Sequence, residues 1–234
     1  MGVSEMEPQL IFLPGLGADH RLFKYQTAAF PNSIAVDWIE PKPRETLEEY
    51  AGRLADSLGP FSTPPIVCGL SLGGMVAPYL AKRLGSPALI LLCTVRKPGE
   101  FPRRYYPAWI QCRFCFPLFW VAQFCIQLLA RFFLLFRRFW RHRIDPEILQ
   151  QFTETPTSRL TRLTAMMLHW AYLPGRSSDF AGETLLVHGS RDPLLPIRLT
   201  QPDVRIEHGG HLLVLSHPTE INAIIQDCVS KHHS

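Results

Sequence analysis

Short apolar runs alternate with amphipathic segments along most of the chain. The runs are bounded by glycine, proline or polar residues, and they predict strands at residues 9–13, 33–39, 65–69, 88–93, 184–188 and 204–206. The segments between and after them predict helices at residues 19–30, 46–58, 75–84 and 212–229. Apolar strands joined by crossover helices are typical of parallel sheets. The pattern therefore predicts an α/β fold with a mostly parallel sheet of about six strands and helices on both faces.

The alternation stops between residues 95 and 178, where aromatic segments replace the strands. Half of the chain's Phe, Trp and Tyr residues lie between Tyr105 and Trp140. We therefore predict a core made of residues 1–94 and 179–234, interrupted by a helical cap, or lid, at residues 95–178. Residues 114–130 carry no charge, but this run is shorter than the ~20 residues that cross a bilayer, so we expect no spanning helix.

Charge is distributed unevenly along these 234 residues, whose net charge is +4. Residues 96–143 hold ten Lys or Arg residues and one acid, Glu100, so the rest of the chain is net negative. An acidic body without a recognised binding motif speaks against a nucleic-acid partner. A basic, aromatic segment leaves open a peripheral contact with an anionic membrane.

The cysteines indicate a reducing compartment. Most of the six lie in apolar runs, where a free thiol behaves as a small hydrophobic group. Residues 1–8 carry acids and no apolar stretch of the kind that opens a secretory signal. We therefore expect a cytoplasmic protein, with membrane association left open.

The strongest chemical signal is the segment Gly69-Leu70-Ser71-Leu72-Gly73-Gly74, between a predicted strand and a predicted helix. A serine on a tight strand-to-helix turn has a strained backbone, so the positions two residues before and after it must be nearly free of side chain. Gly69 and Gly73 meet this requirement. The turn would lift the Ser71 hydroxyl above the sheet edge, beside the amides of a helix N-terminus, which predicts a nucleophile.

A serine hydroxyl is a poor nucleophile unless a general base takes its proton and a third group orients that base. Asp192 follows the predicted strand at residues 184–188, and His211 follows the last predicted strand. Both therefore fall on loops at the carboxyl end of the sheet, which is the end that carries Ser71.

Other assignments remain open at this point. Asp192 precedes a proline, so its role could instead be to cap a turn. Glu100 could then supply the acid, because it follows an earlier strand. His208 and His188 compete with His211 for the role of base. His208 and His211 could also form half of a metal site, but no second cluster of ligands accompanies them, so we predict no metal and no organic cofactor.

Together these segments resemble the α/β-hydrolase superfamily, in particular its small, lidded, esterase-like members. The resemblance covers about residues 9–93 and 183–230. It rests on Leu13-Pro14-Gly15-Leu16-Gly17, the turn at Ser71, His188-Gly189-Ser190-Arg191-Asp192 and Gly210-His211. Many relatives carry His-Gly where this chain has Pro14-Gly15, a difference that leaves the backbone amide of the next residue in place.

The resemblance implies a role for each site residue. Ser71 would be the nucleophile, His211 the base and Asp192 the acid that orients the imidazole. The backbone amides of Leu16 and Leu72 would form the oxyanion hole.

Within the predicted cap, the aromatic residues Phe116, Phe119, Trp120 and Phe124 would face an apolar acyl or aryl group, although packing against the body accounts for most of them equally well. The resemblance thus implies a serine hydrolase that cleaves a small-molecule carboxylic ester or thioester through an acyl-enzyme intermediate. Two alternatives remain open, because one fold serves many functions: a non-catalytic small-molecule receptor and a membrane-surface lipid hydrolase.

Overall fold

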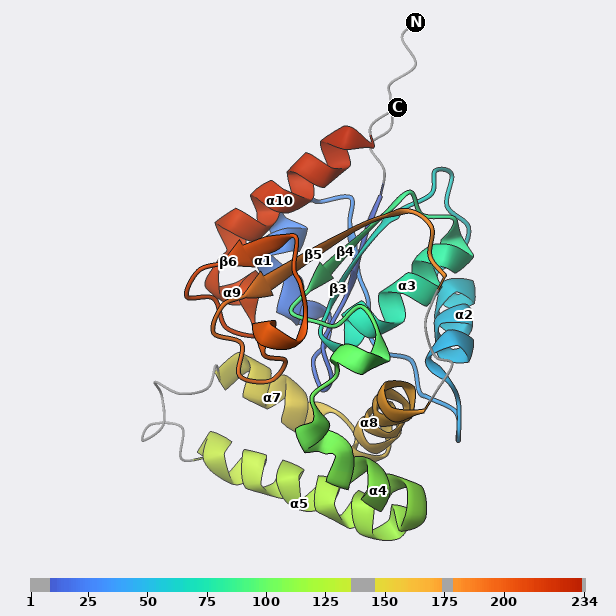
Figure 1. Ribbon diagram of the computed structural model, residues 1–234, viewed down its shortest axis with the longest axis vertical. Coiled ribbons are helices and arrows are strands. Elements are labelled where there is room, and N and C mark those ends of the chain that lie inside the picture. Colours follow the sequence, from blue (N-terminus) through green and yellow to red (C-terminus); the bar gives the residue numbers. More distant parts are fainter. Residues whose placement is uncertain (1–8, 136–145, 174–178, 233–234) are drawn as a thin grey trace, which may run out of the picture.

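The computed structural model describes residues 9–135, 146–173 and 179–232. Its six strands form one sheet in the order β2-β1-β3-β4-β5-β6, and every neighbouring pair is parallel (Figure 1). This confirms the predicted α/β fold and the number of strands. The strands are β1 (Leu10–Leu13), β2 (Ile34–Ala35), β3 (Ile66–Leu70), β4 (Ala88–Leu92), β5 (Glu183–Gly189) and β6 (Val204–Ile206).

Two apolar layers cover the two faces of this sheet. Successive side chains of a strand point to opposite faces, and in β1 the side chains of Ile11 and Leu13 enter one buried cluster while Leu10 and Phe12 enter the other. The first cluster includes residues of α2 (Leu47–Leu58) and α3 (Leu72–Leu84). The second is completed by α9 (Leu213–Ser216) and α10 (Pro218–Lys231), beside α1 (Lys24–Ala29). Burial on both faces explains why the strands are continuously apolar.

Helix ends follow local chemistry where the sequence provides it. The Thr46 hydroxyl accepts from the Glu49 amide, and the Glu49 carboxylate accepts from the Thr46 amide, so α2 begins with a capping box. The predicted single helix at residues 212–229 is wrong: it is divided into α9 and α10, because Pro218 has no N–H with which to continue the first helix.

Two other predicted boundaries are also wrong. The helix expected from Met75 begins at Leu72. Gly73 and Gly74 are therefore helical, although two consecutive glycines suggest a loop. The strand expected at residues 33–39 is only two residues long. Beyond it the chain leaves the sheet edge, and the indole of Trp38 donates to the carbonyl of Gly15 instead (3.1 Å).

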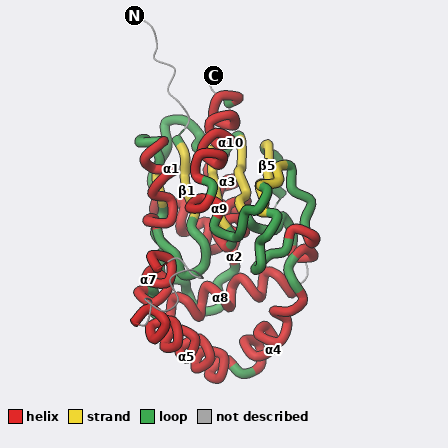
Figure 2. The backbone as a smooth tube through the Cα atoms, turned by 90° about the vertical axis from the view of Figure 1, so that its left-hand side faces the viewer, coloured by secondary structure: helices red, strands yellow, loops and turns green. Residues whose placement is uncertain are grey.

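In the described part of the chain, four α-helices follow β4 and precede β5, and we refer to them as the inserted helices: α4 (Tyr106–Phe114), α5 (Phe116–Leu135), α7 (Pro146–Glu154) and α8 (Thr157–Tyr172). They form a layer at one end of the molecule, with α5 outermost (Figures 1 and 2). The side chain of Gln151 in α7 accepts from the amide of Asp19, which lies in the loop after β1 (3.2 Å). The inserted helices therefore lie over the carboxyl ends of the strands.

A matched pair of glycine substitutions tests the close packing at the start of α3. A Cβ on Gly73 would lie 2.2 Å from the carbonyl oxygen of Leu13, whereas a Cβ on Gly52, within α2, would have no neighbour within 4 Å. We expect Gly73→Ala to lower the free energy of unfolding by about 1–3 kcal/mol or more, and Gly52→Ala to raise it by about 0.5–1 kcal/mol. Urea unfolding followed by circular dichroism measures both, and equal stability of Gly73→Ala and wild type would contradict this packing.

Candidate active site

Ser71 lies on a strained turn between β3 and α3. Its backbone angles are φ 55° and ψ −116°, a conformation that residues with a side chain rarely adopt. Two hydrogen bonds to neighbouring segments hold it there: the Ser71 amide donates to the carbonyl of Leu92 (3.0 Å), and the Thr94 hydroxyl donates to the carbonyl of Ser71 (2.7 Å). A Cβ on Gly69 would lie 2.4 Å from the carbonyl oxygen of Gly73, so the turn also needs glycine at this position.

The structure brings Asp192 and His211 together, 19 residues apart in sequence. The Nδ1 atom of His211 lies 2.7 Å from Oδ2 of Asp192, whose side chain is fully buried. The other oxygen, Oδ1, accepts from the amides of Leu194 and Leu195 at 2.8 and 3.0 Å. The carboxylate therefore caps its turn with one oxygen and holds the imidazole with the other, so the two roles that the sequence left open for Asp192 are compatible.

His188 lies beneath this pair. Its Nε2 atom is 2.7 Å from the carbonyl oxygen of Leu195 and 3.3 Å from Oδ2 of Asp192. Because a carbonyl oxygen only accepts, the proton of the His188 ring is on Nε2. The Nδ1 atom is buried and has no hydrogen-bond partner among the described residues. The sequence suggested a structural histidine here but not that its partner is Asp192.

These contacts control the charge of Asp192. Burial alone would raise the pKa of its carboxyl, but hydrogen bonds from His188, His211 and the Leu195 amide outweigh burial and hold the pKa far below its usual range. Asp192 is therefore an anion at neutral pH. Because the Asp192 anion accepts a hydrogen bond from Nδ1 of His211, the ring proton of this imidazole stays on Nδ1. The Nε2 atom is then able to accept a proton.

The competing acid and base lie elsewhere. The carboxylate of Glu100 accepts from the amide of Arg96 (2.9 Å) and so closes a local turn. The side chain of His208 is exposed, and its amide donates to the hydroxyl of Ser190 (2.9 Å). Among the hydrogen bonds of the described residues, neither side chain is bonded to Asp192 or His211.

The loop after β1 carries the predicted oxyanion donors and is held on two sides. The indole of Trp38 fixes the carbonyl of Gly15 from below. Gly17 has a φ of +73°, and a Cβ there would lie 2.4 Å from the ring of Phe152 in α7. Within the described part of the chain, the amides of Leu16 and Leu72 donate to no protein acceptor. Sequence reasoning missed Trp38 and Phe152, since no local pattern links them to this loop.

The serine and the histidine are connected through consecutive residues after β4. The Thr94 hydroxyl bonds to the carbonyl of Ser71, and the Cys93 thiol donates to the carbonyl of Gly210, next to His211 (3.4 Å). No hydrogen bond joins the Ser71 hydroxyl to His211 among the contacts of the described residues. Catalytic hydrogen bonds are often long in the free enzyme and shorten when substrate binds.

Cys93, Asp192 and His211 also place one potential metal-ligand atom each within 4.8 Å of one another. A thiol binds metal as the thiolate, and burial raises the pKa of Cys93 well above its ordinary value, with the nearby charge of Asp192 adding to this effect. The site residues therefore fit an acid–histidine pair better than a metal site.

The four aromatic residues predicted to face the substrate all lie on α5, but their surroundings differ. Phe119 is 2% exposed and belongs to a core cluster. Trp120 and Phe124 stack on each other at 5.8 Å between ring centroids, with 41% and 42% of their surface exposed. Phe116 lines a separate cavity. We therefore do not assign Trp120 and Phe124 to the substrate site.

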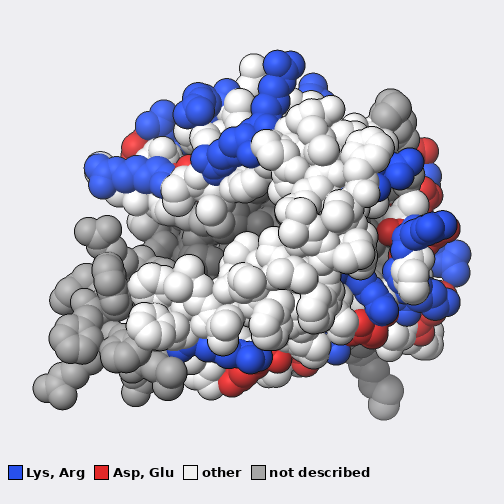
Figure 3. All heavy atoms as spheres, turned by 90° about the horizontal axis from the view of Figure 1, so that it is seen from below, with Lys and Arg blue, Asp and Glu red and all other residues white. Residues whose placement is uncertain are grey.

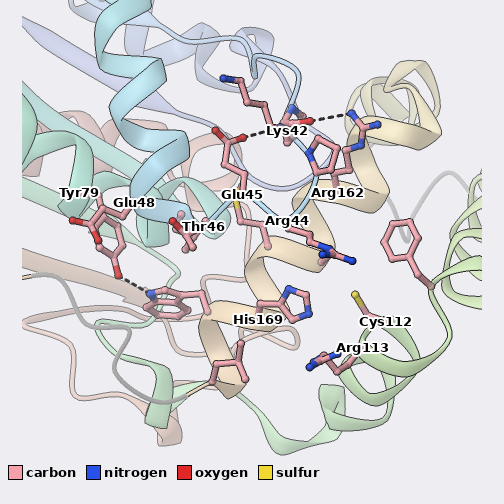
Figure 4. Close-up of a pocket in the computed structure, with 18 residues that line it drawn as sticks. Lys42, Arg44, Glu45, Thr46, Glu48, Tyr79, Cys112, Arg113, Arg162 and His169 are labelled. Atoms are coloured by element: carbon pink, nitrogen blue, oxygen red, sulfur yellow. Dashed lines mark hydrogen bonds between the residues drawn. The ribbon is translucent and has the colours of Figure 1, made fainter.

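This cavity has a volume of about 860 Å³ and lies between the inserted helices and the loop before α2. Figure 4 shows Arg44, Arg113 and His169 around it, and Met166 and Trp170 also line it. None of the five residues predicted to act at the carbonyl group, Ser71, Asp192, His211, Leu16 and Leu72, lines it.

The sheet is parallel, a strained serine follows β3, and an acid–histidine pair follows β5 and β6. These features together define a class of α/β proteins, and the comparison of sequences identifies that class. The sequence profile of the Alpha/beta hydrolase family matches residues 10–224. The chain belongs to this family, as its resemblance predicted. No curated protein matches the sequence significantly.

Solved structures agree on the fold. A thermophilic esterase from Thermogutta terrifontis is 19% identical, with a TM-score of 0.66 over 97% of this chain and 91% of that chain. An enol-lactonase from Burkholderia xenovorans LB400 is 18% identical, with a TM-score of 0.66 over 96% and 92%. MenH from S. aureus is 17% identical, with a TM-score of 0.64 over 100% and 97%. The chain therefore has the overall architecture of esterases and lactonases, and family membership supports a hydrolase.

The charge of Asp192 gives a pH-dependent prediction. Because its pKa is lowered on folding, its contribution to stability is complete above the ordinary carboxyl pKa of about 4 and decreases as pH falls below it. We expect Asp192→Asn to cost about 1–3 kcal/mol of unfolding free energy at pH 7, and the difference from wild type to shrink below about pH 4. Urea titrations across this pH range measure it. Asp227→Asn, at an exposed site on α10, is the control, and a difference for Asp192→Asn that did not change with pH would contradict the assignment.

Proposed function

We propose that the protein is a serine hydrolase that cleaves a carboxylic ester or thioester through an acyl-enzyme intermediate. One observation carries the proposal: the strained turn at Ser71 and the hydrogen-bonded pair of Asp192 and His211 lie at the same edge of one parallel sheet. Family membership and the esterase and lactonase architecture support it.

In the acylation step, the Ser71 oxygen attacks the carbonyl carbon of the substrate while Nε2 of His211 takes the hydroxyl proton. The imidazolium that forms is stabilised by the carboxylate of Asp192, which is already charged and already bonded to Nδ1. The carbonyl oxygen becomes an oxyanion and accepts hydrogen bonds from the amides of Leu16 and Leu72. Collapse of this intermediate expels the alcohol or thiol, which receives the proton from His211.

Deacylation repeats these steps with water. His211 removes a proton from the water molecule, whose oxygen attacks the acyl carbonyl carbon, and the same two amides hold the second oxyanion. Collapse releases the carboxylic acid and returns the proton to Ser71. The proton lost from Ser71 leaves with the alcohol or thiol and is replaced by a proton from water, so the chemistry consumes only the ester or thioester and water.

The loop after β1, which carries Leu16 and which we call the oxyanion loop, has surroundings that favour an apolar acyl or aryl group on a small-molecule substrate. The ring of Phe152 lies against Gly17, and Trp38 lies behind Gly15, so apolar side chains flank the loop on both sides. Phe152 comes from the inserted helices, which we propose act as a cap that excludes water from the acyl-enzyme. We propose these contacts in place of Trp120 and Phe124 of α5, whose side chains are exposed.

Labelling with a fluorophosphonate tests the nucleophile. We expect wild type to react covalently and to hydrolyse aryl esters of short to medium acyl chains, and Ser71→Ala to lose labelling and at least about a thousandfold in kcat/KM. Ser57→Ala is the matched control, because its hydroxyl only caps a carbonyl within α2. Labelling of Ser71→Ala at the wild-type rate would exclude the mechanism, and binding of esters without turnover by wild type would favour a receptor.

Two histidines three residues apart provide a second, internal test. His211→Ala removes the base and should lower kcat by about a thousandfold or more. It should also lower the free energy of unfolding, because the buried Asp192 carboxylate loses a hydrogen-bond partner. His208→Ala removes an exposed ring from the same loop and should leave kcat close to wild type. Steady-state kinetics with one aryl ester compare the two variants, and an equal loss in both would mean that the loop, rather than the His211 base, is required.

A further inference from the structure

The outward side of α5 is a continuous apolar surface. Six apolar side chains share it, each with 42–56% of its surface exposed, and apart from the adjacent pair Leu128 and Leu129 they follow one another at intervals of three or four residues. We call them the outer face of α5: Leu118, Val121, Phe124, Leu128, Leu129 and Phe132. Contiguous exposed apolar surface of this kind is unusual on a soluble monomer and marks an interaction site. Seen from below, the molecule shows a broad uncharged surface here, with Lys and Arg side chains and some Asp and Glu side chains along its margin (Figure 3).

The inward side of α5 is fixed to the protein. Phe119 and Ala130 are buried, and Gln127 is only 1% exposed. Its amide donates to the carbonyls of Phe152 and Thr155 and accepts from the hydroxyl of Thr157, all from α7, α8 and the turn between them.

This attachment decides how α5 could meet a bilayer. By length and composition alone, residues 116–134 are sufficient to cross a membrane. Crossing would break the three hydrogen bonds of Gln127 and place its amide in hydrocarbon, which is unfavourable. A helix with one side held by protein and the other side apolar lies in the plane of the interface instead. At 1.5 Å per residue, α5 would lie along about 30 Å of membrane surface.

The charge around this face selects the partner. Between Glu100 and Asp145 the sequence contains eight arginines and no acid. Of these, Arg113 lies just before α5 and Arg131 lies within it, and both are exposed. Arg113 also lines the cavity described above, and the guanidinium of Arg131 donates to the carbonyl of Thr153 in α7 (3.2 Å), so both lie at the margin of the outer face. Two copies of the protein that met through α5 would bring these positive charges together, whereas anionic lipid headgroups neutralise them. Four further arginines lie outside the described residues and contribute here only as sequence charge: Arg137, Arg138, Arg141 and Arg143.

We infer that the outer face of α5 docks the protein onto an anionic membrane surface. The six apolar side chains enter the boundary between headgroups and acyl chains, and the flanking arginines contact lipid phosphates. The attachment is peripheral and reversible. It requires no chemistry at Ser71, so Ser71→Ala should bind vesicles as wild type does, and failure of either proposal can be recognised separately.

Sedimentation with vesicles tests this inference, using phosphatidylcholine alone or mixed with phosphatidylglycerol. Wild type should sediment with the mixed vesicles at low salt, and much less with phosphatidylcholine alone or at high salt, because salt screens the arginines. Leu128→Glu and the uncharged Leu128→Gln should each weaken the partition coefficient, by about tenfold or more for Leu128→Glu. The matched control Tyr25→Glu adds the same charge at an exposed aromatic residue of α1 and should bind like wild type.

Two further measurements show whether lipid or a second copy of the chain covers this face. Trp120 also lies on the exposed part of α5, so its emission should shift to shorter wavelength on vesicle binding, and Trp120→Phe should lose that shift. The inference is overturned if wild type does not bind mixed vesicles at low salt, or if Leu128→Glu binds as tightly as Tyr25→Glu. It is also overturned if light scattering shows a dimer that Leu128→Glu dissociates, since the second copy would then occupy the face.

Discussion

The whole arrangement depends on how closely the backbones of β1, β3 and α3 approach one another around Ser71. A single methyl group at Gly73 would overlap the carbonyl of Leu13, and one at Gly69 would overlap Gly73. This contact forces Ser71 into its strained conformation and directs it toward the carboxyl edge of the sheet. Parallel pairing then places the loops after β1, β5 and β6 at that edge, so the fold itself brings distant segments to one site.

Stabilisation of this edge comes from hydrogen bonds that each serve two segments. Asp192 joins its own turn to His211, and His188 ties the same carboxylate to the strand beneath it. Cys93 and Thr94 connect the histidine loop to the serine turn. Hydrogen bonds to the ionised form lower the pKa of a carboxyl group, which explains why Asp192 stays charged although its side chain is buried.

Features determined by local chemistry were predictable from sequence, and features determined by distant packing were not. The strand runs, the capping box at Thr46 and the serine turn are each encoded in a few consecutive residues. The start of α3 is not predictable from local sequence, because a Cβ on Gly73 would overlap Leu13 of β1 and a Cβ on Gly74 would overlap Thr94, and no local pattern records either contact. The aromatic residues of α5 were placed in the substrate site because composition does not say which side of a helix faces inward, and Trp120 and Phe124 are exposed. Likewise, the sequence places Asp192 on a loop at the carboxyl end of the sheet, but it does not show whether Asp192 caps a turn or orients His211. In the structure its carboxylate does both.

The most direct test of the central claim is a crystal structure of the protein after reaction with a small alkyl phosphonate. We predict phosphorus bonded to the Ser71 oxygen, one phosphonyl oxygen within about 3 Å of the amides of Leu16 and Leu72, and Nε2 of His211 within hydrogen-bond reach of the Ser71 oxygen. Phosphorus on another residue, or a phosphonyl oxygen directed away from both amides with His211 out of reach, would contradict the account.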